Sequence, residues 1–266
     1  GVFGMFSWRG RRQLIALSIP LFLISGIIFW FGARLLPQAT CFDNRRNQGE
    51  TSVDCGGPCR ACELKSPAPL SIFWARAGMA GPNAYDSIAL VENPNQSLSS
   101  AKVEYEFILL DELGIIGRRT GETYIYSQER LYVIEPNIET SREALRVEFR
   151  VTHIEWQLNQ ERPPVFIVER REHSVVQADG LKQIMVEAQF FNVNPLDFRE
   201  VETSVVVFDT DGNLIGANRI LTENLSAGSR GVIKSIWPGA FGGVVGKIEV
   251  IPRVNLFDSD VIIRPR

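Results

Sequence analysis

The sequence predicts an all-β protein behind an N-terminal transmembrane helix and a small disulfide-rich module. Three observations predict this: an uncharged apolar run near the N-terminus, four cysteines confined to residues 41–62, and two β-type regions that resemble each other. With 45% hydrophobic and 22% charged residues, the chain of 266 residues is expected to fold. We divide it into a cytoplasmic tail, the transmembrane helix, the cysteine-rich module with its linker, a first β-domain and a second, over residues 1–13, 14–34, 35–66, 67–172 and 173–266.

The run Leu14–Ala33 contains twenty residues without a charge. A helix of that length is about 30 Å long, the thickness of a bilayer's hydrocarbon core. A cleavable signal peptide would have a shorter apolar region. Arginines precede the run and no acidic residue occurs before Asp43, so the N-terminus is expected in the cytoplasm and the C-terminal region outside the cell membrane; these arginines are Arg9, Arg11 and Arg12.

The cysteine-rich module follows the apolar run, and its four cysteines are Cys41, Cys55, Cys59 and Cys62. Few apolar side chains accompany them, so covalent cross-links must hold the segment together. Outside the membrane two disulfides are expected, and the spacing leaves their pairing open. A four-thiolate zinc site is an alternative, although two separated C-x-x-C pairs are absent. Glycines 56 and 57 are expected to form a tight turn.

Calcium is a second alternative for this module. Oxygen-bearing side chains gather in the loop between the first two cysteines, and oxygen ligands suit this hard cation. The same residue types are also ordinary turn formers. Both interpretations stay open for the five candidates Asp43, Asn44, Asn47, Glu50 and Asp54.

The string C-x-D-x-x-x-N-x-x-E-T-x-x-D-C-G-G-x-C-x-x-C, from Cys41 to Cys62, resembles a short cysteine-rich segment of many bacterial surface proteins. The resemblance implies an extracytoplasmic location and no defined activity. Asn44 stands where such segments usually have glycine, and the pair Arg45-Arg46 is atypical.

Two later regions are expected to be sheets with one wet face. Val103, Tyr105, Phe107 and Leu109 alternate with glutamates and other residues, which is the period of a β-strand. A similar run follows 98 positions later, where Asp209 stands in the place of Asp111, and each copy has an Asn-Pro before it and a turn after it. About 90–100 residues of this pattern per copy suit an immunoglobulin-like sandwich. A type I′ hairpin turn is expected at residues 211–212.

The run Phe107-Ile-Leu-Leu-Asp111, with its glycine-containing turn, resembles the motif of the FxLYD family of bacterial immunoglobulin-like domains. The second copy has Val205-Val-Val-Phe-Asp209 and lacks the leading aromatic residue. The resemblance implies a sandwich fold and no active site, because the motif residues of the family are structural.

The chemistry-bearing residues do not indicate an enzyme or a cofactor. His153 is expected on the apolar face of a strand and His173 in a polar connector between the domains, and neither has a nucleophile motif beside it. A net charge of −3 argues against nucleic acid as a partner.

We expect a non-enzymatic membrane protein that presents its β-domains for protein–protein interaction, in cell-envelope assembly or adhesion. The expected contacts are the bilayer, through residues 14–34, and an envelope or surface protein; an oligomer is possible. The alternatives are a passive spacer and a metal-binding sensor that acts through the cysteine module.

Overall fold

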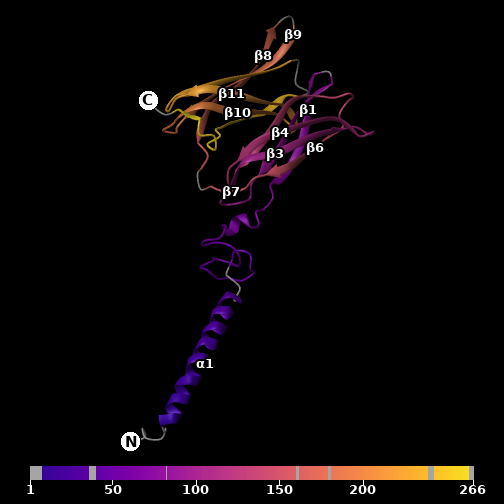
Figure 1. The fold of residues 1–266 in the computed structure, drawn as a ribbon. Coiled ribbons are helices and arrows are strands. Elements are labelled where there is room, and N and C mark those ends of the chain that lie inside the picture. Colours follow the sequence, from indigo (N-terminus) through magenta and orange to yellow (C-terminus); the bar gives the residue numbers. More distant parts are fainter. Residues whose placement is uncertain are drawn as a thin grey trace. The chain divides into compact units, whose positions relative to one another are not determined.

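The computed structural model describes residues 8–35, 40–81, 83–159, 162–178, 181–238 and 243–263. The chain divides into two compact units, Gly1–Cys62 and Glu63–Arg266 (Figure 1). The first unit holds a helix and the cysteine-rich module, and the second holds the strands.

Helix α1 spans Trp8–Leu35, so the predicted helix is confirmed as secondary structure. Leu17, Phe22 and Leu23 are 69%, 80% and 61% exposed, and at 3.6 residues per turn they point roughly 100–140° apart. Between residues 16 and 32, α1 therefore exposes apolar side chains on all sides. No helix in the described ranges combines the length and the hydropathy that crossing a membrane requires.

The second unit is built almost entirely of antiparallel strands, which confirms the predicted all-β class of this region. Only the short 3₁₀ helix η1 (Cys62–Leu64) stands at the junction of the two units. The described strands are β1 (Ser71–Gly81), β2 (Ala84–Glu92), β3 (Leu98–Leu110), β4 (Ile115–Ile125), β5 (Arg130–Glu139), β6 (Arg146–Ile154), β7 (Gln157–Leu158), β8 (Phe166–Ala178), β9 (Leu181–Asn192), β10 (Asp197–Asp209), β11 (Leu214–Leu225), β12 (Arg230–Pro238), β13 (Val245–Arg253) and β14 (Ile262–Ile263).

The strands form two halves with the same topology. In the first half the sheet β1-β2-β5 faces the sheet β4-β3-β6, and the short β7 pairs with the start of β3. In the second half β8-β9-β12 faces β11-β10-β13, and β14 pairs with the start of β10. The predicted duplication thus reappears strand by strand. The expected domain boundary between residues 172 and 173 falls inside β8, which pairs with β9 and lies in the second half.

The predicted alternation of β3 produces the core of the first half. Val103, Tyr105, Phe107 and Leu109 are at most 2% exposed and pack against the sheet β1-β2-β5. The intervening glutamates face the other side of the sheet, as the two-residue period of a strand requires.

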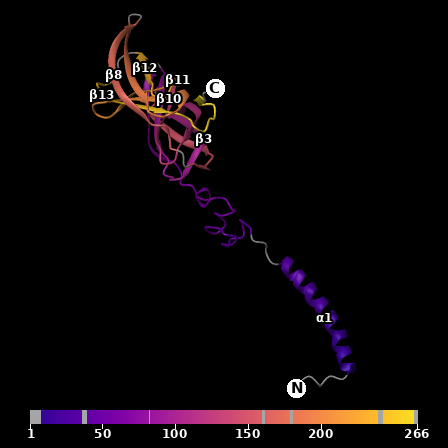
Figure 2. The ribbon, with the colours of Figure 1, turned by 90° about the vertical axis from the view of Figure 1, so that its left-hand side faces the viewer.

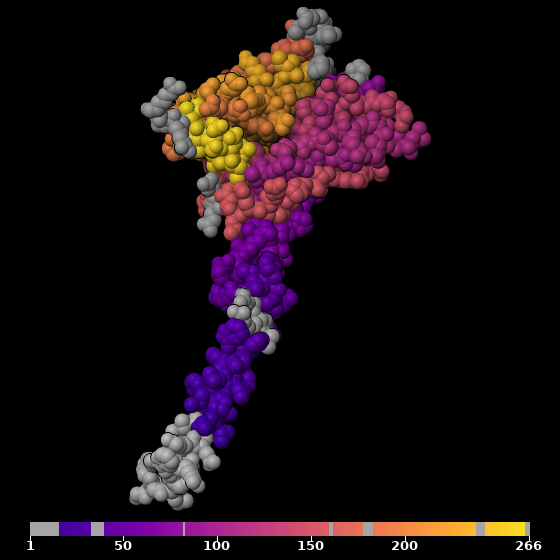
Figure 3. Space-filling model, in the orientation of Figure 1, coloured from indigo at the N-terminus to yellow at the C-terminus, as the bar shows by residue number. Residues whose placement is uncertain are grey.

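A third apolar cluster joins the two halves. Ile88 on β2 and Ile134 on β5 pack against Val206 on β10 and Ala217 on β11, and all four are at most 2% exposed. The sheet β1-β2-β5 therefore has one face in the core of the first half and the other against the second half. The four sheets form four layers, with β8 and β3 on opposite sides of β10 in Figure 2. The two halves are also in close contact in the space-filling view of Figure 3.

Polar contacts strengthen this joint. Arg253 of the second half forms a bidentate ion pair with Glu129 of the first, with Nε–Oε1 and Nη2–Oε2 distances of 2.8 and 3.1 Å. The two side chains are 6% and 11% exposed. Burial lowers the pKa of Arg253, but the charge and hydrogen bond of Glu129, together with Tyr124 and Glu202, outweigh it, so the net pKa is raised and the guanidinium stays charged. Tyr126 Oη donates to the Val254 carbonyl at 2.8 Å.

A buried asparagine closes the same corner in both halves. Asn93 Nδ2 donates to the carbonyls of Leu98 and Tyr126 at 2.7 and 2.8 Å. Asn192 Nδ2 makes the equivalent pair of bonds at 3.0 and 3.1 Å. Both asparagines are fully buried. The expected match between the two Asn-Pro dipeptides is wrong here, because the hydrogen bonds make Asn192, and not Asn194, the equivalent of Asn93.

The next asparagine in each half anchors the chain that enters the half. Asn95 exchanges two hydrogen bonds with the backbone of Ala68, at 2.9 and 2.8 Å. Asn194 does the same with Val165, at 3.1 and 2.8 Å. The duplication therefore extends to the segments that precede the first strand of each half.

Two local expectations are wrong. The turn between β10 and β11 has positive φ only at Gly212 (81°), whereas a type I′ turn needs two such residues; Asp209 N instead donates to Asn213 O across a three-residue loop. His153 faces outward, 53% exposed, because a bulge between the Tyr105–Val151 and Glu104–His153 pairs reverses the alternation.

Candidate functional site

The four cysteines of the module form two interlaced disulfides. Cys41 bonds Cys59 and Cys55 bonds Cys62, a choice that the spacing alone left open. Disulfide formation within the module is thus confirmed. Because no cysteine of the described residues is free, no thiolate is left in this structure for the alternative zinc site.

The predicted tight turn at Gly56 and Gly57 is confirmed. Both residues have positive φ, 80° and 58°. A Cβ at position 56 would collide with Thr51, and one at position 57 with the carbonyl of Gly49. Only glycine combines this backbone conformation with such close packing.

The calcium candidates form hydrogen bonds with one another that close the loop between the first two cysteines. Asp43 Oδ2 accepts a hydrogen bond from Asn47 Nδ2 at 2.6 Å, which is the first cause of the lowered pKa of Asp43. Asp54 Oδ1 accepts the backbone N–H of Asn44 at 3.0 Å. Among the described residues, the carboxylates of Asp43, Glu50 and Asp54 do not gather within one cluster of metal-ligand size. Calcium binding by these residues stays a prediction.

Glu50 differs from the other candidates because it is buried, at 4% exposure. Its Oε2 accepts the backbone N–H groups of Asn47 and Asp54, both at 3.2 Å. Its Oε1 lies 3.2 Å from Cys59 Sγ. Sequence analysis placed Glu50 in an oxygen-rich loop and gave no sign of this contact with sulfur.

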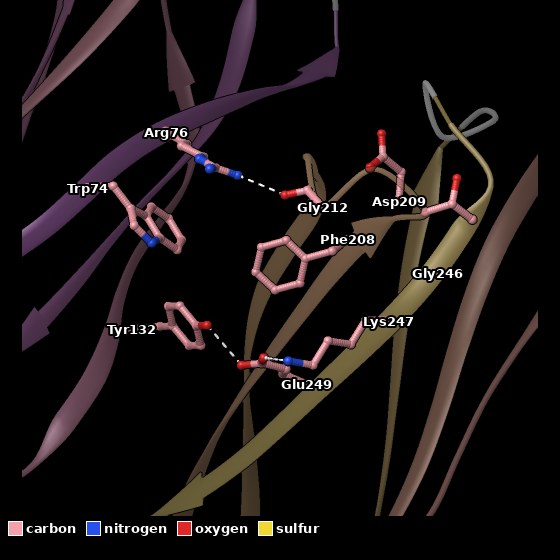
Figure 4. A pocket seen from close by; sticks show the side chains of 10 residues that line it. Trp74, Arg76, Tyr132, Phe208, Asp209, Gly212, Gly246, Lys247 and Glu249 are labelled. Atoms are coloured by element: carbon pink, nitrogen blue, oxygen red, sulfur yellow. Dashed lines mark hydrogen bonds and ion pairs between the residues drawn. The ribbon is translucent and has the colours of Figure 1, made fainter.

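A groove in the second unit lies where the two halves meet. It has a volume of roughly 580 Å³, and Figure 4 shows its walls converging from both halves. Trp74 on β1 and Tyr132 on β5 form the wall of the first half, and Phe208 on β10 faces them from the second. All three side chains also border the apolar cluster between the halves. The groove is therefore a product of the joint, and its polar rim comprises Arg76, Asp209, Lys247 and Glu249.

The charged groups of the groove are held in place by internal contacts. Arg76 lies 4.9 Å above the Trp74 ring and donates to the Gly212 carbonyl at 3.0 Å. Glu249 accepts a hydrogen bond from Tyr132 Oη at 2.8 Å and pairs with Lys247 at 2.6 Å. Burial, followed by the bond to Glu249, raises the pKa of Tyr132, so the hydroxyl stays a donor at neutral pH.

Asp209 completes the rim with its carboxylate charged. The side-chain amide of Asn213, followed by its backbone N–H, lowers the pKa of Asp209. The charges of two cationic and two anionic side chains thus cancel at the rim of a groove that is walled by three aromatic rings. A concave site with aromatic walls and a few oriented polar groups is suited to binding.

Sequence analysis did not find this groove. Its residues come from four strands and one turn between positions 74 and 249, and none belongs to a recognisable motif. The two histidines lie elsewhere: His153 is beside Glu155, and His173 is an exposed residue of β8 opposite Val186, not part of a connector.

No known protein family matches this chain, and no curated protein has a significantly similar sequence.

Proposed function

We propose that this chain is a non-enzymatic, single-pass membrane protein that presents two immunoglobulin-like domains outside the membrane to bind a partner protein, in cell-envelope assembly or adhesion. The observation that carries the proposal is the groove between the halves. Trp, Tyr and Arg are the residues most often responsible for protein–protein affinity, and Trp74, Tyr132 and Arg76 line this groove together.

The topology of each half supports the immunoglobulin-like assignment. Two antiparallel sheets pack face to face, and the strand order pairs the first, second and fifth strands against the third, fourth and sixth. Such sandwiches commonly serve as extracellular recognition modules.

The rigidity of the joint supports a binding role. Because the aromatic wall of the first half and Phe208 of the second are held by a common apolar cluster, the groove is formed before a partner arrives. Binding to a preformed groove avoids part of the ordering cost of association.

The apolar run Leu14–Ala33 supports the membrane anchor. Its twenty uncharged residues match the thickness of a bilayer, and the described apolar side chains of α1 are exposed on all sides. Three preceding arginines favour a cytoplasmic N-terminus. The β-halves and the cysteine-rich module would then lie outside, where disulfides persist.

The anchor and its orientation are tested on the full chain in membranes. We expect the protein to resist alkaline extraction from a membrane pellet. A protease added to intact spheroplasts should cleave the β-halves and leave a tag on the N-terminus intact. A protein released by alkali, or a protected C-terminal unit, would contradict the proposal.

Partner binding is tested by photo-crosslinking in the native host. p-Benzoylphenylalanine in place of Phe208 should give a discrete cross-linked protein band, which should weaken at least several-fold when Trp74→Ala is added. The control carries the same photoprobe in place of Leu113, which is 83% exposed and is not one of the residues that line the groove. A band that is equally strong from position 113, or that is indifferent to Trp74→Ala, would favour the passive spacer instead.

A further inference from the structure

The cysteine-rich module contains a buried carboxylate oxygen that faces a sulfur atom without a proton. Oε2 of Glu50 has two backbone donors, whereas Oε1 contacts Cys59 Sγ, at 3.2 Å. In the disulfide this sulfur carries no hydrogen, so it cannot donate to Oε1. Within the described residues, no other donor reaches that oxygen.

Reduction would change this balance. A Cys59 thiol carries a hydrogen that Glu50 Oε1 can accept at the same distance. A buried charged acceptor without a donor is costly, so the oxidised state bears a penalty that the reduced state relieves. The effect is specific, because the side-chain atoms of Cys41, Glu50 and Cys59 lie within 4.8 Å of one another and the second disulfide is outside this group.

Accessibility favours the same disulfide. Cys55 of the second disulfide is 4% exposed, whereas Cys41, Cys59 and Cys62 are half-buried. An attacking thiolate can therefore reach either sulfur of Cys41–Cys59 but only the Cys62 sulfur of Cys55–Cys62, which leaves the second bond one route of attack instead of two.

We propose that Cys41–Cys59 is an exchangeable disulfide, reduced by an external dithiol protein in preference to Cys55–Cys62, and that Glu50 is the positioning residue that accepts the hydrogen bond of the released Cys59 thiol. This activity is independent of what the groove binds.

The exchange is balanced without another reactant. A thiolate of the dithiol attacks Cys41 Sγ, a mixed disulfide forms, and the electron pair of the broken S–S bond leaves on Cys59 Sγ, which takes up a proton. The second thiol of the partner then attacks the mixed disulfide and releases Cys41 as a thiol. The partner becomes a disulfide, the module becomes a dithiol, and the two thiol protons of the partner end on Cys41 and Cys59 by way of the solvent.

The experiment equilibrates the full chain, in detergent, with graded ratios of reduced and oxidised dithiothreitol. Acid quenching, alkylation and peptide mass spectrometry then report how far each of the four cysteines is reduced. We expect Cys41 and Cys59 to become labelled together at ratios where Cys55 and Cys62 remain bonded. Simultaneous reduction of both disulfides, or prior reduction of Cys55–Cys62, would overturn the proposal.

The role of Glu50 is tested with Glu50→Gln, which keeps an acceptor for the two backbone N–H groups and removes the buried charge. The equilibrium constant for reduction of Cys41–Cys59 should fall roughly tenfold, while that of Cys55–Cys62 stays the same. Glu63→Gln, an exposed carboxylate beside Cys62, is the matched control and should change neither. An unchanged constant in Glu50→Gln would remove the role of Glu50. If that variant does not fold, the order of reduction in the unmodified chain still decides whether Cys41–Cys59 is exchangeable.

Discussion

Ile88 of the first half and Glu187 of the second occupy equivalent positions, each five residues before the buried asparagine that closes its corner. Ile88 lies opposite Ile134 and is buried against the second half. Glu187 lies opposite Lys234, and the two form an ion pair of 3.1 Å on an outer face of the unit. The same surface is thus apolar where the halves meet and charged where the stack of sheets ends.

Replacing the Glu187–Lys234 ion pair with apolar residues is therefore predicted to make the protein self-associate. The double change Glu187→Ile and Lys234→Ile should make the outer face resemble the one that packs between the halves. Because apolar sheet faces associate to leave water, we expect dimers or larger species in sedimentation velocity at micromolar concentration. The control Glu187→Gln with Lys234→Gln removes the charges without adding apolar surface and should remain in the same state as the unmodified chain. A monodisperse Ile variant would contradict this interpretation.

The buried pair between Arg253 and Glu129 predicts a large effect from removing one partner. Arg253→Met leaves the Glu129 carboxylate buried without its cation, so the free energy of unfolding should fall by about 3–5 kcal/mol. Urea denaturation measures this. Replacing both residues with apolar ones should recover much of the loss. The control Arg130→Met breaks a more exposed ion pair with Glu92 and should cost about 1 kcal/mol or less; equal losses at the two positions would contradict the prediction.

Removing the amide of Asn93 should also be costly. Asn93→Ala leaves the buried carbonyls of Leu98 and Tyr126 without their donor, and we expect a loss of about 2–3 kcal/mol by urea denaturation. Asn95→Ala removes bonds to an exposed segment and should cost less, about 1 kcal/mol. If the two variants are equally stable, the buried amide does not hold the corner together.

The pKa of Asp86 predicts a pH-dependent effect. Burial raises this pKa, with partial offset from the Asn137 N–H, so the folded state binds the proton more tightly than the unfolded state. The ionised carboxylate therefore costs stability above its folded pKa, and the cost disappears as the pH falls through that value. Asp86→Asn should stabilise the protein at neutral pH and lose that advantage in acid.

The matched control for Asp86 is Asp111, whose pKa is lowered, first by the hydrogen bond from Arg142. Its ionised form adds stability above the unfolded pKa, and the gain is lost as the pH falls through the folded pKa. Asp111→Asn should thus destabilise the protein at neutral pH and not in acid. Melting temperatures of both variants between pH 3 and 8 check the opposite signs, and parallel curves would contradict the assignment.

The strands could be predicted from the sequence because their signal is local. The alternation from Val103 to Leu109 directly reports a buried face, and the structure has that face in the core. The position of His153 could not be predicted, because one extra residue in β6 reverses the alternation and no residue type marks the bulge. The sequence predicted a turn at Gly212 correctly. The length of the loop could not be predicted in the same way, because it depends on the pairing of Asp209 with Asn213.

The groove could not be predicted for a different reason. Trp74, Tyr132 and Phe208 come together only because an outer face of each half is buried against the other. In the sequence, β2 and β10 have apolar residues on both of their sides. A second apolar side is equally compatible with tighter packing within one half, so it does not reveal the contact between the halves. The contact of Glu50 with Cys59 likewise depends on the disulfide pairing, which spacing does not determine.

The interlaced disulfides also set how far the module can be stretched. With both bonds intact, the shortest covalent path from Cys41 to Cys62 crosses the first bridge, where the Cα atoms are 5.6 Å apart, and then three residues, a reach of about 16 Å at full extension. Opening Cys41–Cys59 alone diverts the path through fourteen residues to Cys55 and across the remaining bridge, and the reach becomes about 50 Å. A tensile load between the two ends of the module would therefore be carried by the Cys41–Cys59 bond, and its reduction would convert a short, stiff link into a long, compliant tether.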